Sequence, residues 1–184
     1  MKDLLKRHLA SCKKRVVGID PGETTGICCF EGPDLLDARQ LKTKDAADGG
    51  AQILRYIKEW NPNVLVVEDY RVYAWKTQDH TWASLHTPRL IGILEYIGQT
   101  ECIPVVKRMA QQAKGFCTDD KLKAWGLYQK GQRHSRDAIR HAVYYLLFDI
   151  AKAHQLPKES NHGKAQSEAE EASQEGQGDS EGSG

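Results

Sequence analysis

The stretch that most constrains the fold covers residues 16–30 and reads VVGIDPGETTGICCF. Two apolar runs flank a Pro-Gly turn, a pattern typical of two neighbouring strands. We therefore expect strands over 15–20 and 25–30. A lone charge is costly inside a strand, so Asp20, which ends the first of them, is expected at the rim of the sheet.

The rest of the chain adds further strands and several helices. The most apolar strand, VLVVE over 64–68, is expected near the centre of the sheet, because both of its faces are hydrophobic. The other predicted elements are a strand over 35–43, a helix over 45–60, a helix from residue 87 or 88 to 98, a strand over 102–106, a helix over 119–128 and a helix over 135–153. This order predicts an α/β fold: a mixed five-stranded sheet with three antiparallel strands first, flanked by helices.

Composition divides the chain into three parts. Residues 1–14 form a basic leader, 15–154 are long enough for one domain with a real core, and 155–184 form an acidic tail. Residues 158–184 of this tail lack branched aliphatic and aromatic residues, so we expect the tail to be disordered and dispensable for chemistry. Residues 158–184 carry seven acidic and two basic side chains. Residues 1–157 carry 24 basic and 18 acidic ones, a balance that permits a nucleic-acid partner.

Three carboxylates are candidates for a common site. Asp20 and Glu68 each end a predicted strand, and Asp137 lies on a predicted helix in one stripe with His134 and His141. Acidic side chains that share a site repel one another unless cations neutralise them, and carboxylate oxygens suit Mg²⁺, with Mn²⁺ as a substitute. Two such ions would support phosphodiester hydrolysis. Each acid also has a purely structural interpretation, as turn former, helix cap or dipole partner.

These motifs carry a resemblance to a known family. VVGIDPGETTG with Asp20, VLVVED with Glu68 and HSRDAIRHAV with His134 and Asp137 resemble the first, second and last acidic motifs of the RuvC family of Holliday-junction resolvases, a branch of the RNase H-like nucleases. The resemblance covers about residues 15 to 150, and KLKAWGLYQKG is similar to phage-type members. It implies an RNase H-like fold and a metal-dependent endonuclease that resolves branched DNA, often as a homodimer.

The last motif departs from the common family pattern. Many members have D-x-x-D there, whereas this chain has H-x-x-D, with His134 at the first position. An imidazole can ligate a metal or move protons, so we keep His134 among the catalytic and metal-binding candidates with Asp20, Glu68 and Asp137. We expect His141 to have a supporting or packing role, and Gly22 and Gly26 to make room for a backbone phosphate.

Two segments could hold DNA. The basic stretch after the predicted strand 102–106 contains Lys107, Arg108 and Lys114, and phosphate contacts require such side chains. The aromatic segment after Glu68 contains Tyr70, Arg71 and Trp75, which could stack on unpaired bases. A solvated charged face and core packing are the alternative interpretations.

Rival functions share parts of this pattern. The GIDPGETTG segment approximates the phosphate loop of actin-like and sugar-kinase ATPases, but those proteins need a second such loop. A DNA-binding protein without catalysis is disfavoured by the retention of all three acids. A nuclease of the same fold for flaps, forks or RNA–DNA hybrids stays open, because surface shape selects the substrate.

Cysteine usage and hydropathy give an expectation for the compartment. The five cysteines form no C-x-x-C pair, and the longest apolar stretch, AVYYLLF, is too short to span a bilayer. We therefore expect a cytoplasmic protein without a membrane partner, located in the host cytoplasm if a phage encodes it.

Overall fold

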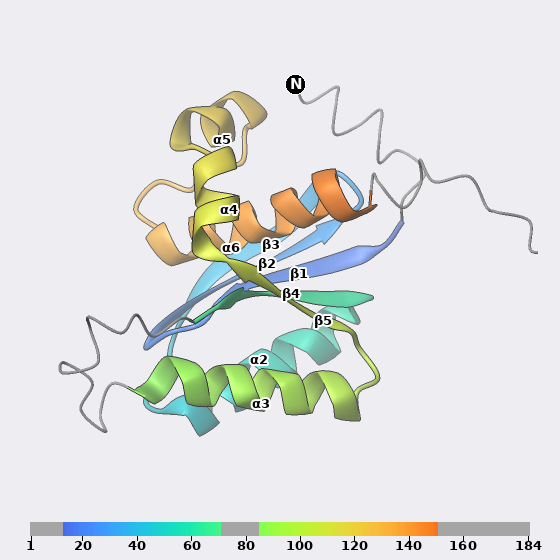
Figure 1. Ribbon diagram of the computed structural model, residues 1–184, viewed down its shortest axis with the longest axis vertical. Coiled ribbons are helices and arrows are strands. Elements are labelled where there is room, and N and C mark those ends of the chain that lie inside the picture. Colours follow the sequence, from blue (N-terminus) through green and yellow to red (C-terminus); the bar gives the residue numbers. More distant parts are fainter. Residues whose placement is uncertain (1–12, 71–84, 151–184) are drawn as a thin grey trace, which may run out of the picture.

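The fold is built on one five-stranded sheet with helices on both faces (Figure 1). The computed structural model describes residues 13–70 and 85–150. The strands are β1 (Arg15–Asp20), β2 (Thr24–Glu31), β3 (Asp34–Lys42), β4 (Val64–Asp69) and β5 (Val105–Met109). The helices are α2 (Ala46–Trp60), α3 (His86–Thr100), α4 (Ala110–Phe116), α5 (Asp119–Trp125), α6 (Arg133–Tyr145) and the π-helix η3 (Leu146–Ile150).

The sheet has the order β3-β2-β1-β4-β5, with β1 at its centre. β1 pairs antiparallel with β2, which pairs antiparallel with β3, while β1, β4 and β5 run parallel. The predicted mixed sheet of three antiparallel strands followed by parallel strands is confirmed. β1 and β4 are apolar along most of their length because helices cover both of their faces.

Alternation along the strands divides the core into two layers. Val17 and Ile19 of β1 pack with α2 and α3 on one face, whereas Val16 packs with α6 on the other. Figure 1 shows α2 and α3 on one side of the sheet and α4 and α6 on the opposite side. Even-numbered residues of β1 and β4 therefore face α6, and Asp20 and Glu68 share this parity.

Helix α6 approaches the sheet closely because two glycines lie beneath it. A Cβ atom on Gly18 would lie 2.4 Å from the Ala138 carbonyl oxygen, and one on Gly26 would lie 1.9 Å from the His134 carbonyl oxygen. Any larger residue would force the helix outward. The expectation that Gly26 makes room for a phosphate is thus corrected, because Gly26 makes room for the backbone of α6.

Several predicted elements differ from those observed. The helix predicted over 119–128 ends at Trp125, because Gly126 adopts a left-handed conformation with a φ of 71°. Helix α4 was not predicted. The strand predicted over 102–106 is β5, Val105–Met109, because Cys102 has a φ of 55° and Ile103 N–H donates to Gly98 O, which hold the chain in a turn until Pro104. The helix predicted over 135–153 begins earlier, at Arg133, and becomes the π-helix η3 from Leu146. Residues 151–153 and the predicted leader and tail lie outside the described residues, apart from residues 13 and 14.

Among the helices described, none is both long and apolar enough to cross a bilayer.

Candidate active site

Two of the predicted carboxylates meet at one rim of the sheet. Ile19 of β1 is paired with Val67 of β4, so Asp20 and Glu68 follow directly on neighbouring parallel strands. Both side chains point toward α6, and both are largely withdrawn from solvent, with 12% and 17% of their side-chain surface exposed. The parallel pairing of β1 with β4 therefore brings two acids together that are 48 residues apart in the chain.

Helix α6 supplies the other two predicted site residues. His134 lies in its first turn, where Gln40 of β3 accepts a hydrogen bond from the His134 backbone N–H over 3.0 Å. The imidazole Nδ1 lies 2.8 Å from Asp20 Oδ2. Asp137 follows one turn later and is buried. The structure thus brings all four predicted residues to the same rim.

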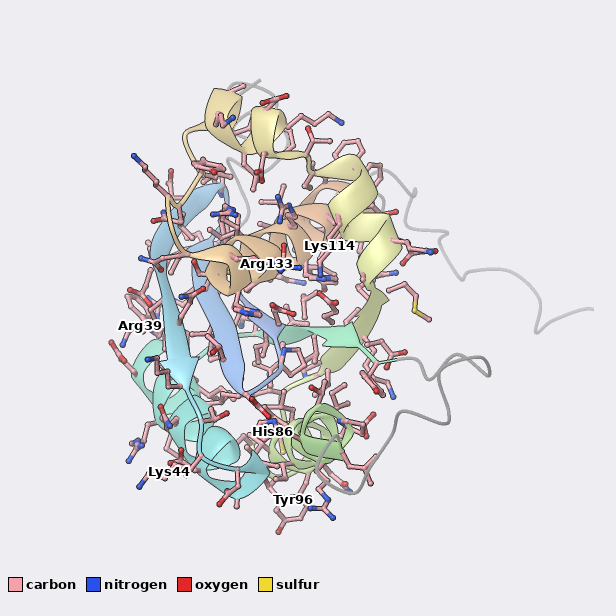
Figure 2. All side chains as sticks on the ribbon, turned by 90° about the vertical axis from the view of Figure 1, so that its left-hand side faces the viewer. Arg39, Lys44, His86, Tyr96, Lys114 and Arg133 are labelled. Carbon is pink, nitrogen blue, oxygen red and sulfur yellow. The ribbon has the colours of Figure 1, made fainter. Side chains whose placement is uncertain are left out.

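Lys114 of α4 joins this cluster, although the sequence suggested only a DNA contact for it. Its Nζ lies 3.1 Å and 3.0 Å from the two oxygens of Glu68 and 3.2 Å from Asp137 Oδ2. Figure 2 shows Lys114 in the space between α4 and α6. The ammonium group is therefore a shared partner of two of the three acids.

Two largely buried side chains of α6, His141 and Arg140, orient the acids. His141, fully buried on α6, places Nε2 2.8 Å from Glu68 Oε2. Arg140 bonds through Nη1 to Asp137 Oδ1, through Nη2 to Asp119 of α5, and through Nε to the Cys117 carbonyl oxygen over 2.8 Å. The expected supporting role of His141 agrees with this contact. Sequence reasoning did not single out Arg140 or Asp119, although the i, i+3 spacing of Asp137 and Arg140 on a helix could have suggested the first pair.

The electrostatics of the three acids are uneven. Burial, together with the neighbouring charge of Glu68, raises the pKa of Asp20 to about 7 despite the opposing contact with His134. Burial also opposes ionisation of Glu68, but the hydrogen bond with His141 and the charges of His141 and Lys114 outweigh it and lower the pKa of Glu68 to about 2. His141 and Lys114 thus stabilise the ionised form of Glu68, whereas burial and the charge of Glu68 destabilise the ionised form of Asp20.

This donor set fits divalent cations. Carboxylate oxygens and one imidazole are suitable ligands for Mg²⁺ or Mn²⁺. In the described part of the chain, no three His, Cys, Asp or Glu side chains are grouped so that they could hold one ion as they stand. The Lys114 ammonium lies between Glu68 and Asp137 in this arrangement.

The other predicted DNA contacts lie around the site or away from it. Arg108 is paired in register with Glu68 and forms an ion pair with Asp149 of η3. Lys107 points to the opposite face, where its Nζ lies 2.6 Å from Glu95 of α3. Tyr70 packs against the core layer of α2 and α3. Arg71 and Trp75 lie outside the described residues.

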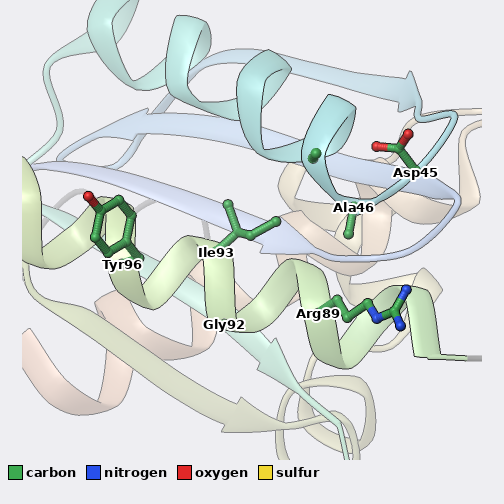
Figure 3. A pocket seen from close by; sticks show the side chains of 7 residues that line it. Asp45, Ala46, Arg89, Gly92, Ile93 and Tyr96 are labelled. Atoms are coloured by element: carbon green, nitrogen blue, oxygen red, sulfur yellow. The ribbon is translucent and has the colours of Figure 1, made fainter.

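A groove of about 610 Å³ lies between α2 and α3, on the face away from the carboxylates. Figure 3 shows its wall of Asp45, Arg89, Ile93 and Tyr96. Tyr96, at the rim of the groove, is 67% exposed. The groove shares no residue with the carboxylate site.

Comparison with known proteins identifies the architecture. No family model and no curated protein matches the chain. A solved structure of T. thermophilus RuvC in complex with a Holliday junction matches with a TM-score of 0.58 and 18% identity, covering 72% of this chain and 94% of that one. The chain has a RuvC-like fold. A second Thermus thermophilus RuvC structure matches with a TM-score of 0.53 and 20% identity, covering 71% and 94% of the two chains.

A third match extends the comparison beyond bacteria. The yeast mitochondrial Holliday junction resolvase gives a TM-score of 0.53 at 15% identity, covering 82% of this chain and 85% of that one. The RuvC-like architecture confirms the fold expected from the motifs of Asp20, Glu68 and Asp137. At these identities the similarity establishes the fold, and the activity must be argued from the site.

Proposed function

We propose that this protein is a metal-dependent endonuclease that resolves branched DNA, with the Holliday junction as its substrate. The observation that carries the proposal is the convergence of Asp20, Glu68 and Asp137, with His134, at one rim of a RuvC-like sheet. Burying three acids together is costly for a fold. Bound cations would offset this cost, because they would neutralise the carboxylates.

In this proposal, Asp20, Glu68, Asp137 and His134 would hold two Mg²⁺ ions, or Mn²⁺ in their place. Bound ions of this kind supply an activated water and neutralise charge on the leaving oxygen in phosphodiester hydrolysis. His141 and Arg140 hold one oxygen each of Glu68 and Asp137, so the acids are oriented before substrate arrives. His134, with 40% of its side chain exposed, is accessible to substrate for ligation or proton transfer.

Basic and aromatic side chains would hold the DNA. Lys114 and Arg108 lie on the α6 face beside Glu68, which makes them candidates for phosphate contacts. Lys107, Tyr70, Arg71 and Trp75 are proposed as peripheral contacts. A four-way junction has two-fold symmetry, which favours a homodimer in which each copy cuts one strand.

The test is cleavage of four synthetic substrates, with and without Mg²⁺: a four-way junction, a flap, a duplex and an RNA–DNA hybrid. We expect Mg²⁺-dependent cleavage of the junction, and loss of at least about 100-fold in rate for Asp20→Asn, Glu68→Gln and Asp137→Asn with junction binding retained. Asp69→Asn is the matched control, because Asp69 follows Glu68 but faces the opposite side of the sheet.

Each alternative predicts a different result in this assay. Preferred cleavage of the flap or the hybrid would assign another nucleic-acid structure to the same chemistry. Binding of the junction without cleavage of any substrate would indicate a non-catalytic DNA-binding protein. Cleavage by Asp20→Asn at the wild-type rate would refute the proposed active site.

A further inference from the structure

Lys114 differs in exposure from the other side chains that bind Glu68 and Asp137. Its side chain is 36% exposed, whereas Arg140 is 12% exposed and His141 is fully buried. Water can hydrate the ammonium group if it moves outward, and four methylene groups give it the reach to do so. Lys114 can therefore move away from the two acids and keep its ammonium group hydrated, which the more buried Arg140 and His141 cannot do.

Each of the two acids is held from two sides. Glu68 receives His141 on Oε2 and Lys114 on both oxygens, at 3.0 Å and 3.1 Å. Asp137 receives Arg140 on Oδ1 and Lys114 on Oδ2, at 3.2 Å. If Lys114 moves away, Glu68 Oε1 and Asp137 Oδ2 lose this partner while His141 and Arg140 keep both carboxylates oriented.

We propose that Lys114 is an internal counter-ion of the metal-free site, which bridges Glu68 and Asp137 and is displaced from them when divalent cations bind. The inference rests on the proposed function, because it takes these carboxylates as metal ligands. It adds a competition between a side chain and the metal at the same oxygens. The competition keeps the acids paired before metal arrives and lowers the affinity of the site for metal.

The charges around Lys114 support this role. A lysine ammonium has an ordinary pKa of about 10.4, and the Nζ of Lys114 lies 3.0 Å from Glu68 Oε2 and 3.2 Å from Asp137 Oδ2. The ammonium is therefore charged at neutral pH, as a counter-ion must be. Its displacement has to be driven by the stronger attraction of a doubly charged ion.

The experiment measures Mn²⁺ binding to the full chain without DNA, by isothermal titration calorimetry and by the loss of the free Mn²⁺ signal in electron paramagnetic resonance. Lys114→Met keeps the length of the stem and removes the charge, and Lys114→Gln keeps a polar head group. We expect both variants to bind Mn²⁺ about tenfold more tightly than the wild type. Their metal-free melting temperatures should fall, and Mn²⁺ should raise them by more than it raises that of the wild type.

Arg133→Gln is the control for a general electrostatic effect. Arg133 is exposed and immediately precedes His134, so its removal takes one positive charge from the neighbourhood of the site (Figure 2). We expect its Mn²⁺ affinity to stay within about threefold of the wild type. An equal gain for Arg133→Gln would overturn the proposal, because any nearby charge would then suffice.

The remaining outcomes are also decisive. Unchanged or weaker Mn²⁺ binding by both Lys114 variants, or no binding by any form, would overturn the proposal. A variant that folds only when Mn²⁺ is added would support it, whereas two variants that stay unfolded in excess Mn²⁺ would overturn it. Junction cleavage by the wild type tests the proposed function separately. Tighter binding without cleavage would refute the nuclease and leave the counter-ion role intact.

Discussion

Replacing Asp20 by Asn should stabilise the metal-free protein at pH 8 while it abolishes cleavage. The carboxylate of Asp20 is 12% exposed, and burial beside Glu68 raises its pKa to about 7. An unfolded chain would have a pKa of about 3.9 at this position. A rise of about three pKa units corresponds to about 4 kcal/mol of unfavourable ionisation in the folded state, which is the upper limit of the gain.

The sign of this effect sets its pH dependence. Below about pH 4, Asp20 is protonated in the folded and the unfolded protein, so it does not change the free energy of unfolding. Above about pH 4 the unfolded chain ionises first, and the resulting loss of stability grows until the pH passes about 7, the raised pKa of the folded state. The asparagine of the variant would carry no charge, but it would remain a buried polar group beside His134. We therefore expect a net gain of about 1–3 kcal/mol at pH 8 and almost none at pH 4.

The assay is thermal unfolding followed by circular dichroism in the presence of EDTA, at pH 4, 6 and 8. A gain of this size should raise the melting temperature by several degrees at pH 8. Asp69→Asn, on the opposite face of the same rim, serves as the control and should show no such pH-dependent gain. Equal or lower stability of Asp20→Asn at pH 8, or the same gain at pH 4, would refute the reasoning.

Two further predictions concern α6. Gly26→Ala should lower the free energy of unfolding by at least about 3 kcal/mol, because its Cβ would lie 1.9 Å from the His134 carbonyl oxygen. Gly115→Ala is the control and should not destabilise the protein, because nothing lies within 4 Å of its Cβ position. Urea unfolding of the two variants and the wild type measures both effects. His134→Asp should cleave junctions within about tenfold of the wild-type rate, since an acid can also bind a cation, and His134→Ala should lose at least about 100-fold. Equal rates for the two His134 variants would show that its ligand atoms are not needed.

The elements that carry the site could be predicted from the sequence. Apolar runs that end in Asp20 and Glu68 indicate strands whose last residues lie at a rim, and helical periodicity places His134 and Asp137 on one stripe. These patterns are local, because strand alternation and helical spacing depend on neighbouring residues alone. They were sufficient for the mixed sheet and for the four candidate residues.

The partners of those residues were decided by the tertiary structure. Lys114 reaches Glu68 across 46 positions of sequence, and nothing in its basic segment distinguishes it from Lys107, which binds Glu95 on the other face. Because β5 extends through Lys107 and Arg108 instead of ending before them, strand alternation sends these two side chains to opposite faces of the sheet.

The position of α6 on the sheet was likewise decided by tertiary packing. The sequence suggested that Gly26 leaves room for a phosphate, yet Gly26 and Gly18 set the distance between α6 and the sheet. That distance places the His134 imidazole 2.8 Å from Asp20. Local patterns identify the acids, but their ionisation and their counter-ions depend on which side chains from distant segments are packed against them, because Coulomb and desolvation energies follow distance in space.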